Sequence, residues 1–143
     1  MAVTIRRLRL SDYAAMIALF DVCDLQPRVR GRDSRPNIAK QLRSHRTVYL
    51  GAFDGARLVG TVLGTHDTRK GWINRLAVLP EYRHRGLAVK LVRACERALR
   101  KEGLQIMAAL VEADNVASQS LFRKLGYETT DILYYRRKVR EAV

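Results

Sequence analysis

The residues best suited to chemistry lie at positions 80–88, in the string Pro-Glu-Tyr-Arg-His-Arg-Gly-Leu-Ala between an expected strand and an expected helix. The first amides of a helix lack partners within it and carry partial positive charge, so a helix N-terminus binds phosphate groups. Gly86 would let a ligand approach the backbone closely, and Arg83 and Arg85 could add charge-assisted hydrogen bonds. The string predicts an anion site. A turn with a solvated basic face is the alternative, and one glycine does not decide between them.

The elements around this string follow from the spacing of apolar residues. Alternation predicts strands at 4–9, 47–53, 57–65, 72–78 and 131–139, and helical spacing predicts helices at 13–24, 36–44, 87–99 and 115–125. The nearly unbroken apolar run 105–111 is typical of a strand buried on both faces, in the parallel part of a sheet. The predicted fold is therefore an α/β (α+β) mixed sheet of order β-α-α-β-β-β-α-β-α-β with helices on both sides. Residues 72–111 form its right-handed parallel crossover.

Two motifs in this frame resemble those of a known family. The string Arg83-x-x-Gly86-x-Ala88, preceded by Leu76-Ala77-Val78-x-Pro80, resembles the acetyl-CoA pyrophosphate motif of the GNAT family of N-acetyltransferases. The string Asn115-x-x-Ser118-x-x-Leu121-Phe122-x-Lys124-Leu125-Gly126-Tyr127 resembles the helix that follows the family's second parallel strand. The resemblance covers essentially the whole chain, as a single domain at 1–143, and residues 64–72 resemble a hairpin of small, poorly characterised bacterial members.

The resemblance implies that acetyl-CoA is the cosubstrate and that its pantetheine arm lies between two splayed parallel strands. The implied backbone contacts to that arm come from Leu76, Ala77 and Val78. The pyrophosphate would rest on the amides of Arg83, His84, Arg85, Gly86, Leu87 and Ala88, with Val89 close by. Asn115 matches a position that reaches the pantetheine, and Ser118 and Lys124 lie on the same helix. Asn115 is also a good helix N-cap, and the two roles can coexist.

The implied reaction is direct transfer of the acetyl group to a primary amine, with the amide of Val78 as donor to the oxyanion. A base for the amine and an acid for the departing thiolate would assist it. Cys23 and Cys95 are expected on apolar helix faces, which argues against a covalent acetyl-cysteine.

The proton-transfer groups depart from the family's pattern. Phe122 stands where many members have a general-acid Tyr, and Asn74 and Arg75 stand where many have a strand carboxylate. Glu112 is either a base that acts through water or a solvated surface carboxylate, the commoner case. His66 and Asp67 could border the acceptor site or be structural. The general acid stays unnamed. The departures leave open a second function, an acyl-CoA-binding module with little catalysis.

The chain is strongly basic. Its 143 residues include 27 Lys and Arg against 14 Asp and Glu, a formal charge of +13 that favours polyanionic partners. CoA's phosphates account for part of this charge. Residues 28–46, with seven basic residues and one acid, would border the acceptor in the family, and we call them the basic rim. A nucleic-acid- or ribosome-associated protein is the third hypothesis, but no aromatic stripe or RNA-binding motif accompanies the rim.

Several classes are excluded or disfavoured. Apolar stretches are far shorter than the roughly 20 residues of a membrane span, and the N-terminal sequence has no signal-peptide hydrophobic region. Two cysteines, Cys23 and Cys95, with no metal-ligand spacing predict a cytoplasmic protein without a disulfide or a metal. A homodimer could form through the last strand, which carries Arg136 and Arg137.

Overall fold

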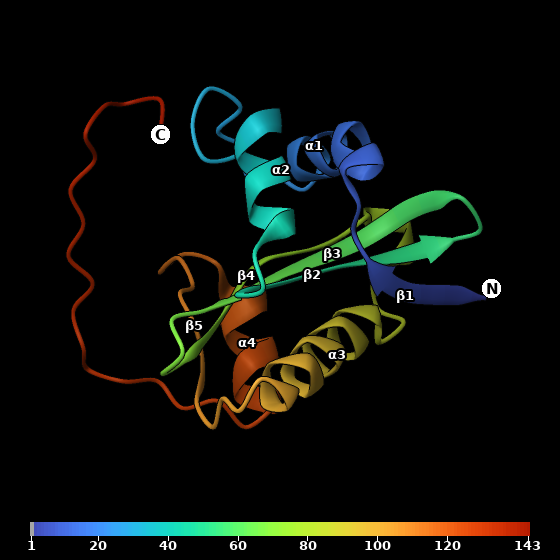
Figure 1. Cartoon of the computed structure of the whole chain (residues 1–143). Helices are drawn as coiled ribbons and strands as arrows, with labels where there is room; N and C mark the ends of the chain where they lie inside the picture. Colours follow the sequence, from blue (N-terminus) through green and yellow to red (C-terminus); the bar gives the residue numbers. More distant parts are fainter. Residues whose placement is uncertain (1) are drawn as a thin grey trace.

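A computed structural model describes residues 2–143 and contains one five-stranded mixed sheet (Figure 1). The strands, in spatial as well as chain order, are β1 (Val3–Arg7), β2 (Thr47–Asp54), β3 (Arg57–His66), β4 (Gly71–Val78) and β5 (Met107–Ala109). All neighbouring pairs are antiparallel except β4 and β5, which are parallel. The expected mixed sheet and its single parallel crossover are confirmed.

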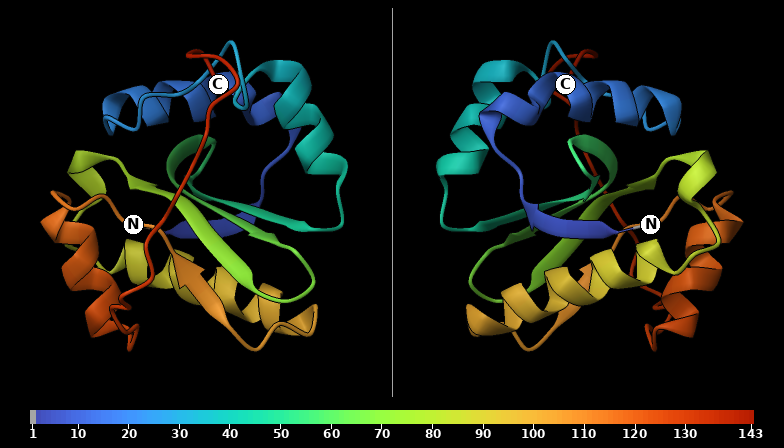
Figure 2. Two further views of the ribbon diagram at one scale, coloured as in Figure 1. Left: turned by 90° about the vertical axis from the view of Figure 1, so that its left-hand side faces the viewer. Right: turned by 90° about the vertical axis from the view of Figure 1, so that its right-hand side faces the viewer.

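Helices cover both faces of this sheet (Figure 2). Helices α1 (Tyr13–Val22) and α2 (Arg35–Arg43) lie on one face, and α3 (Leu87–Lys101) and α4 (Val116–Lys124) lie on the other. The core is buried between them, with Phe20 and Met16 from α1 and Leu91 and Leu99 from α3 among its fully buried side chains. Each helix falls within two residues of its predicted position.

Small residues in the sheet allow α3 to pack closely against it. A Cβ atom added at Gly64 would lie 2.6 Å from the Cys95 sulfur, and one added at Gly71 would lie 2.8 Å from Leu99. At Gly60 the added atom would lie 3.0 Å from Leu91. These glycines therefore fix the depth at which α3 sits on β3 and β4, and with it the position of the helix N-terminus.

A β-bulge interrupts β4. The register against β3 runs from Leu63–Asn74 to Thr61–Ala77, so Arg75 and Leu76 together face Val62. Arg75 has a φ of +50°, in the left-handed region that non-glycine residues rarely adopt. The Thr61 hydroxyl donates a 2.9 Å hydrogen bond to the Arg75 carbonyl and supports the bulge. The bulge bends β4 just before Val78.

The two parallel strands pair only at their beginnings. Gly71, Trp72 and Ile73 lie opposite Met107, Ala108 and Ala109, and β5 ends there while β4 continues to Val78. Beyond Ile73 the edge of β4 therefore has no strand beside it in the described chain. This is the splay that the family resemblance implied.

Two expectations were wrong. The run 105–111 is not buried on both faces, because β5 lies at the sheet's edge, has three partly buried residues, and is flanked by Ile106 and Leu110, which are about half exposed. Residues 131–139 form no strand, although the chain is extended there. Strand formation needs a partner ladder, and in the described chain this segment runs outside β5 without pairing to it (Figure 1).

Candidate functional site

Residues 80–88, where the sequence predicts an anion site, form a turn that leads into the first turn of α3. A short 3-10 turn, η2 (Pro80–Tyr82), leads to Gly86, which has a φ of +75° and precedes the first residue of α3. The Lys90 amide makes a 3.1 Å bond to the Gly86 carbonyl, so the amides of Leu87, Ala88 and Val89 belong to the unpaired first turn. That turn contains no acidic residue. A Cβ added at Gly86 would meet nothing within 4 Å, so the backbone faces open space.

Val78 directs its backbone groups toward the splay. The Leu79 amide bonds to the Val59 carbonyl at 2.9 Å, and Val78 lies opposite Gly60 in the same antiparallel ladder. Because the hydrogen-bonded pairs alternate along such a ladder, the N–H and C=O of Val78 point away from β3. By the same alternation Ala77, opposite Thr61, faces β3. The Val78 amide therefore has no partner on β3 and faces the side of β4 on which the splay lies.

Three elements meet at the Val78 carbonyl. The Arg83 side chain donates through Nε at 2.8 Å, and the Cys23 thiol lies 3.5 Å away. Arg83 also approaches the Cys23 sulfur, at 3.8 Å from Nη2. Sequence reasoning placed Val78 and Arg83 at the site but missed Cys23. It put that thiol on an apolar helix face, whereas Cys23 follows the last residue of α1 and is half-buried beside β4. No motif marks Cys23.

The two thiols should therefore differ in reactivity. Burial raises the pKa of the Cys95 thiol to about 12, with a further contribution from Glu96. Since the thiolate is the nucleophile, we expect one fast equivalent of a disulfide reagent such as DTNB in the native protein at pH 8 and two after denaturation. Cys23→Ala should remove the fast equivalent, and Cys95→Ala should retain it. Fast native labelling of Cys95 would contradict this assignment.

Arg75 anchors the basic rim to the bulge of β4. Its Nη2 bonds to the Asp33 carboxylate at 2.6 Å, and both side chains are largely buried. Asp33 also accepts the Arg28 amide at 2.8 Å, and the Asp33 carbonyl accepts the Tyr13 hydroxyl at 2.6 Å. The guanidinium lies 5.2 Å from the Phe20 ring. Arg75, one of the two residues that stand where the family resemblance implied a strand carboxylate, is thus a cation that holds the rim's single acid.

The second motif forms α4 as expected. The Asn115 side chain accepts the Ser118 amide at 3.1 Å and so caps the helix. Asn115 is an exposed residue, so the cap does not shut its side chain away from solvent. Ser118 is half-buried and Lys124 is exposed in the last turn. The capping role of Asn115 is confirmed, and its ligand role stays a prediction.

The remaining candidates divide into buried and exposed groups. Phe122 is buried edge-to-face against Tyr127, with ring centroids 5.0 Å apart. The Tyr127 hydroxyl donates to buried Glu96 at 2.6 Å. Burial, and after it this hydrogen bond, raises the pKa of Tyr127. Burial raises the pKa of Tyr49 to about 12. Neither tyrosine readily gives up its proton. Glu112 is exposed, just beyond β5.

The hairpin between β3 and β4 is stabilised locally. The Asp67 carboxylate accepts the amides of Arg69 and Lys70 at 2.9 and 2.7 Å, which lowers its pKa. Nδ1 of His66 accepts the Thr68 amide at 3.1 Å. These bonds support the structural interpretation of both residues.

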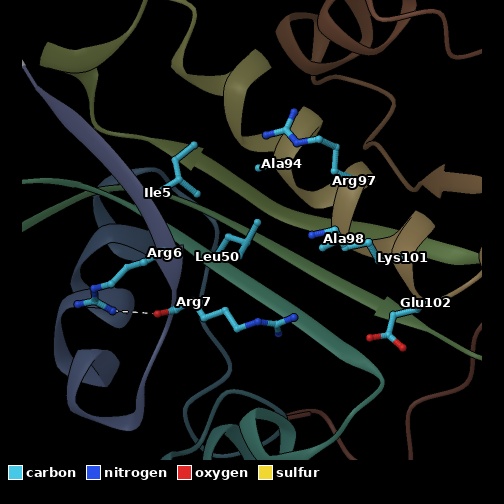
Figure 3. A pocket seen from close by; sticks show the side chains of 9 residues that line it. All are labelled: Ile5, Arg6, Arg7, Leu50, Ala94, Arg97, Ala98, Lys101 and Glu102. Atoms are coloured by element: carbon cyan, nitrogen blue, oxygen red, sulfur yellow. Dashed lines mark hydrogen bonds between the residues drawn. The ribbon is translucent and has the colours of Figure 1, made fainter.

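A hollow of about 380 Å³ lies elsewhere, between β1 and the second half of α3 (Figure 3). Arg97, Lys101 and Glu102 of the helix end line one side of it, facing Ile5 and Arg7 of β1. Because Gly86 is at the opposite end of α3, this hollow does not belong to the anion site.

Two further features bear on the predictions. Within residues 2–143, no three side chains of His, Cys, Asp or Glu come together in a way that could hold a metal ion. None of the helices in that range has the length and apolar character needed to cross a membrane.

Comparisons with known proteins agree with this geometry. Residues 13–127 match the model of the acetyltransferase (GNAT) family. An acetyltransferase of Pectobacterium atrosepticum is 33% identical over 130 residues, covering 90% of each chain. The PaiA N-acetyltransferase of Thermoplasma acidophilum, solved with coenzyme A, has a TM-score of 0.82 at 22% identity and covers 92% of this chain and 93% of its own. The structure of AAC(6')-Iy with a CoA-containing bisubstrate analogue has a TM-score of 0.80 at 20% identity, covering 96% and 99%.

Proposed function

The chain belongs to the acetyltransferase (GNAT) family, and we propose that it transfers an acetyl group from acetyl-CoA directly to a primary amine at the splay between β4 and β5. The proposal rests on two backbone features that lie at one end of the sheet. The unpaired first turn of α3 and the outward-facing amide of Val78 are separated by only eight residues.

The residues fit the cofactor. The amides from His84 to Val89, at a turn with no acid and an open Gly86, would hold the pyrophosphate. The Arg83 amide, which the resemblance included, already donates to the Pro80 carbonyl at 3.2 Å. Arg85, whose guanidinium lies 5.6 Å from the Tyr82 ring, would add a charged contact. Leu76 and Val78 would bond to the pantetheine arm, and Asn115, Ser118 and Lys124 would face it from α4. When bound, acetyl-CoA supplies the activated acetyl thioester.

Groups of the chain itself would stabilise the developing charge and accept a proton. The Val78 amide would donate to the thioester oxygen as negative charge develops there. In enzymes with such a donor, its removal costs roughly 3–4 kcal/mol of transition-state stabilisation. Exposed Glu112 is the carboxylate that we propose as proton acceptor for the amine, through water. Phe122 offers no proton and is buried, so the thiolate would take its proton from water or from the acceptor.

The ion pair between Arg75 and Asp33 holds the basic rim against the bulge of β4. Because this bulge lies just before Val78, the rim would border the acceptor. We propose that the acceptor amine belongs to a molecule with negative charge near the amine. The AAC(6')-Iy neighbour carries an aminoglycoside-derived group in its bound analogue, which supports an amine acceptor in this fold. We also propose a cytoplasmic location, consistent with two unpaired cysteines.

An acyl-CoA-binding module with little catalysis is the second candidate, favoured by the burial of Phe122 and the use of Arg75 in an ion pair. Release of free thiol from acetyl-CoA over a broad panel of amines separates the two functions. We expect turnover with at least one amine, and Phe122→Tyr should not raise the rate, because residue 122 is buried against Tyr127. CoA binding without turnover on any amine would favour the module.

A further inference from the structure

Six basic side chains gather at the end of the sheet opposite the Gly86 turn. They come from four segments of the chain: the end of β1, the residue before β2, the hairpin at 67–70 and the end of α3. We call this surface the basic end, and its residues are Arg7, Arg46, Lys70, Arg97, Arg100 and Lys101. Five of them are exposed and Lys70 is half-buried. The 15 residues of α3 span about 22 Å, which separates the basic end from Gly86.

Hydrogen bonds bring the first three segments together. Nη1 of Arg7 donates to the Thr47 carbonyl at 3.4 Å, so Arg7 lies beside the residue that follows Arg46. The His66 amide donates to the Arg46 carbonyl at 3.0 Å, which places the hairpin of Lys70 on the other side of Arg46. The end of β1, the start of β2 and the hairpin therefore present their cations at one end of the sheet.

The end of α3 adds its cations to the same surface. A Cβ atom added at Gly71 would lie 2.8 Å from Leu99, so the last turn of α3 lies on the start of β4. The hollow of about 380 Å³ described above is lined by Arg7 on the side of β1 and by Arg97 and Lys101 on the side of α3 (Figure 3). The one acidic residue that lines it belongs to the helix end. The basic end is therefore recessed between cations, which allows an anionic group to be contacted from two sides.

The cations of the basic end have no acidic partners within residues 2–143. The salt bridges in that range use five other cations: Arg6, Arg57, Arg75, Arg93 and Lys138. Arg97 and Lys101 also lie one turn apart on α3, an arrangement of like charges that destabilises a helix. The helix dipole favours cations in the last turn of α3, but it does not act on those of the three sheet segments. The positive charge of the basic end is thus left for a partner outside the chain.

The make-up of the basic end favours phosphate groups as ligands. Four of its six residues are arginines, whose planar guanidinium groups bind phosphate oxygens through two parallel hydrogen bonds. Among the large apolar side chains exposed within residues 2–143, none belongs to the four segments. A protein partner would rely on such side chains as anchors, and so would binding to a membrane surface. A nucleic-acid backbone needs only the charge.

The same four segments indicate a duplex in preference to a single strand. They contain no Phe, Tyr or Trp, and proteins that hold single strands use such side chains to stack the bases. Strands about 4.8 Å apart place the cations from β1 to β4 over roughly 14 Å. A duplex carries one negative charge per about 1.7 Å of its axis, so it presents several phosphates over that width.

We propose that the basic end binds the phosphate backbone of a double-helical nucleic acid. Because the cations meet phosphates and not base edges, binding does not depend on the base sequence. Because Gly86 lies at the other end of α3, a bound duplex leaves the first turn of that helix open.

The first test measures binding of fluorescent duplexes by anisotropy over a range of salt concentrations. The probes are DNA and RNA duplexes of about 20 base pairs with mixed sequence. We expect micromolar affinity at low salt and a slope of roughly −3 to −5 in the plot of log affinity against log salt, because each neutralised phosphate contributes about −0.9. Equal affinities would identify the phosphodiester backbone as the ligand, and a preference would identify which of the two nucleic acids it comes from.

Three outcomes of this test would overturn the proposal. Neither duplex binds at low salt, a single strand of the same length binds more tightly than both duplexes, or poly-glutamate of equal charge binds as tightly as they do. The last outcome would assign the surface to acidic proteins. An excess of CoA should leave the duplex bound, and displacement by CoA would move the phosphate contacts to the first turn of α3 and likewise overturn the proposal.

The second test removes the cations. The first variant neutralises the end of α3: Arg97→Gln/Arg100→Gln/Lys101→Gln. It should weaken duplex binding at least about tenfold and make the salt slope shallower by about 2 to 3, because three phosphate contacts are lost. A second variant on the sheet side, Arg7→Gln/Arg46→Gln, should make the slope shallower by about 2, and it tests the surface without changing α3. Thermal unfolding of each variant checks that it is folded.

The matched control removes the same charge from the basic rim: Arg30→Gln/Arg32→Gln/Arg35→Gln. These three residues are exposed, as are those of the helix variant, and they lie outside the basic end. The control should keep the wild-type affinity for the duplexes within about threefold, and its salt slope should stay within about 1 of the wild-type value. An equal loss of binding in the control and in the helix variant would show that binding follows net charge alone, and the basic end would then not be the binding surface.

Discussion

We expect Gly86→Glu to abolish detectable CoA binding. The change puts a carboxylate at the start of α3, where the amides of Leu87, Ala88 and Val89 are unpaired, and thus repels the pyrophosphate. Losing two charge-assisted bonds at roughly 1.5–3 kcal/mol each corresponds to about 100-fold weaker binding or more. Titration calorimetry with CoA measures this loss of affinity.

The control for this variant is Gly103→Glu. Gly103 follows the other end of α3, has a φ of +92°, and its added Cβ would likewise meet nothing within 4 Å. Both variants carry the cost of a side chain in left-handed backbone, roughly 1–2 kcal/mol. Only Gly86→Glu should lose CoA. Equal loss of binding in both would attribute the effect to stability, and undiminished binding in Gly86→Glu would remove the anion site from this turn.

Arg75→Met should be the most destabilising substitution near the site. It leaves the Asp33 carboxylate, 4% exposed, without its cation, and such a loss costs about 3–5 kcal/mol. In chemical denaturation the free energy of unfolding should fall by that amount. Trypsin should also cleave at Arg28 or Arg30 faster, because the Asp33 carboxylate that holds the loop loses its tie to β4.

A double-mutant cycle separates the ion pair from packing. Arg75→Met/Asp33→Asn should recover part of the stability lost in Arg75→Met, since no buried charge is then left unpaired. Arg57→Met removes the exposed Arg57–Glu81 pair and should leave the free energy of unfolding almost unchanged, because solvent screens that pair. Additive effects at positions 75 and 33 would show that the buried pair does not couple the rim to β4.

Most of the fold, and the position proposed for the cofactor, could be predicted from the sequence because they depend on interactions between neighbouring residues. The helical spacing at 87–99 and the glycine before α3 each act over a few residues, so their positions were predictable. The Gly86 and Asn115 motifs are likewise local, because capping and amide exposure depend on the immediate backbone. These features are the basis on which we propose where CoA binds.

Only the tertiary structure decided which distant groups meet. The contacts of Arg75 with Asp33 and of Cys23 with the Val78 carbonyl join residues 42 and 55 positions apart, and no periodicity or motif encodes such pairs. The bulge at Arg75 and the end of pairing at Ala109 depend on strand register. The fate of 131–139 depends on a partner edge, because an apolar alternating segment specifies strand propensity but not what it pairs with.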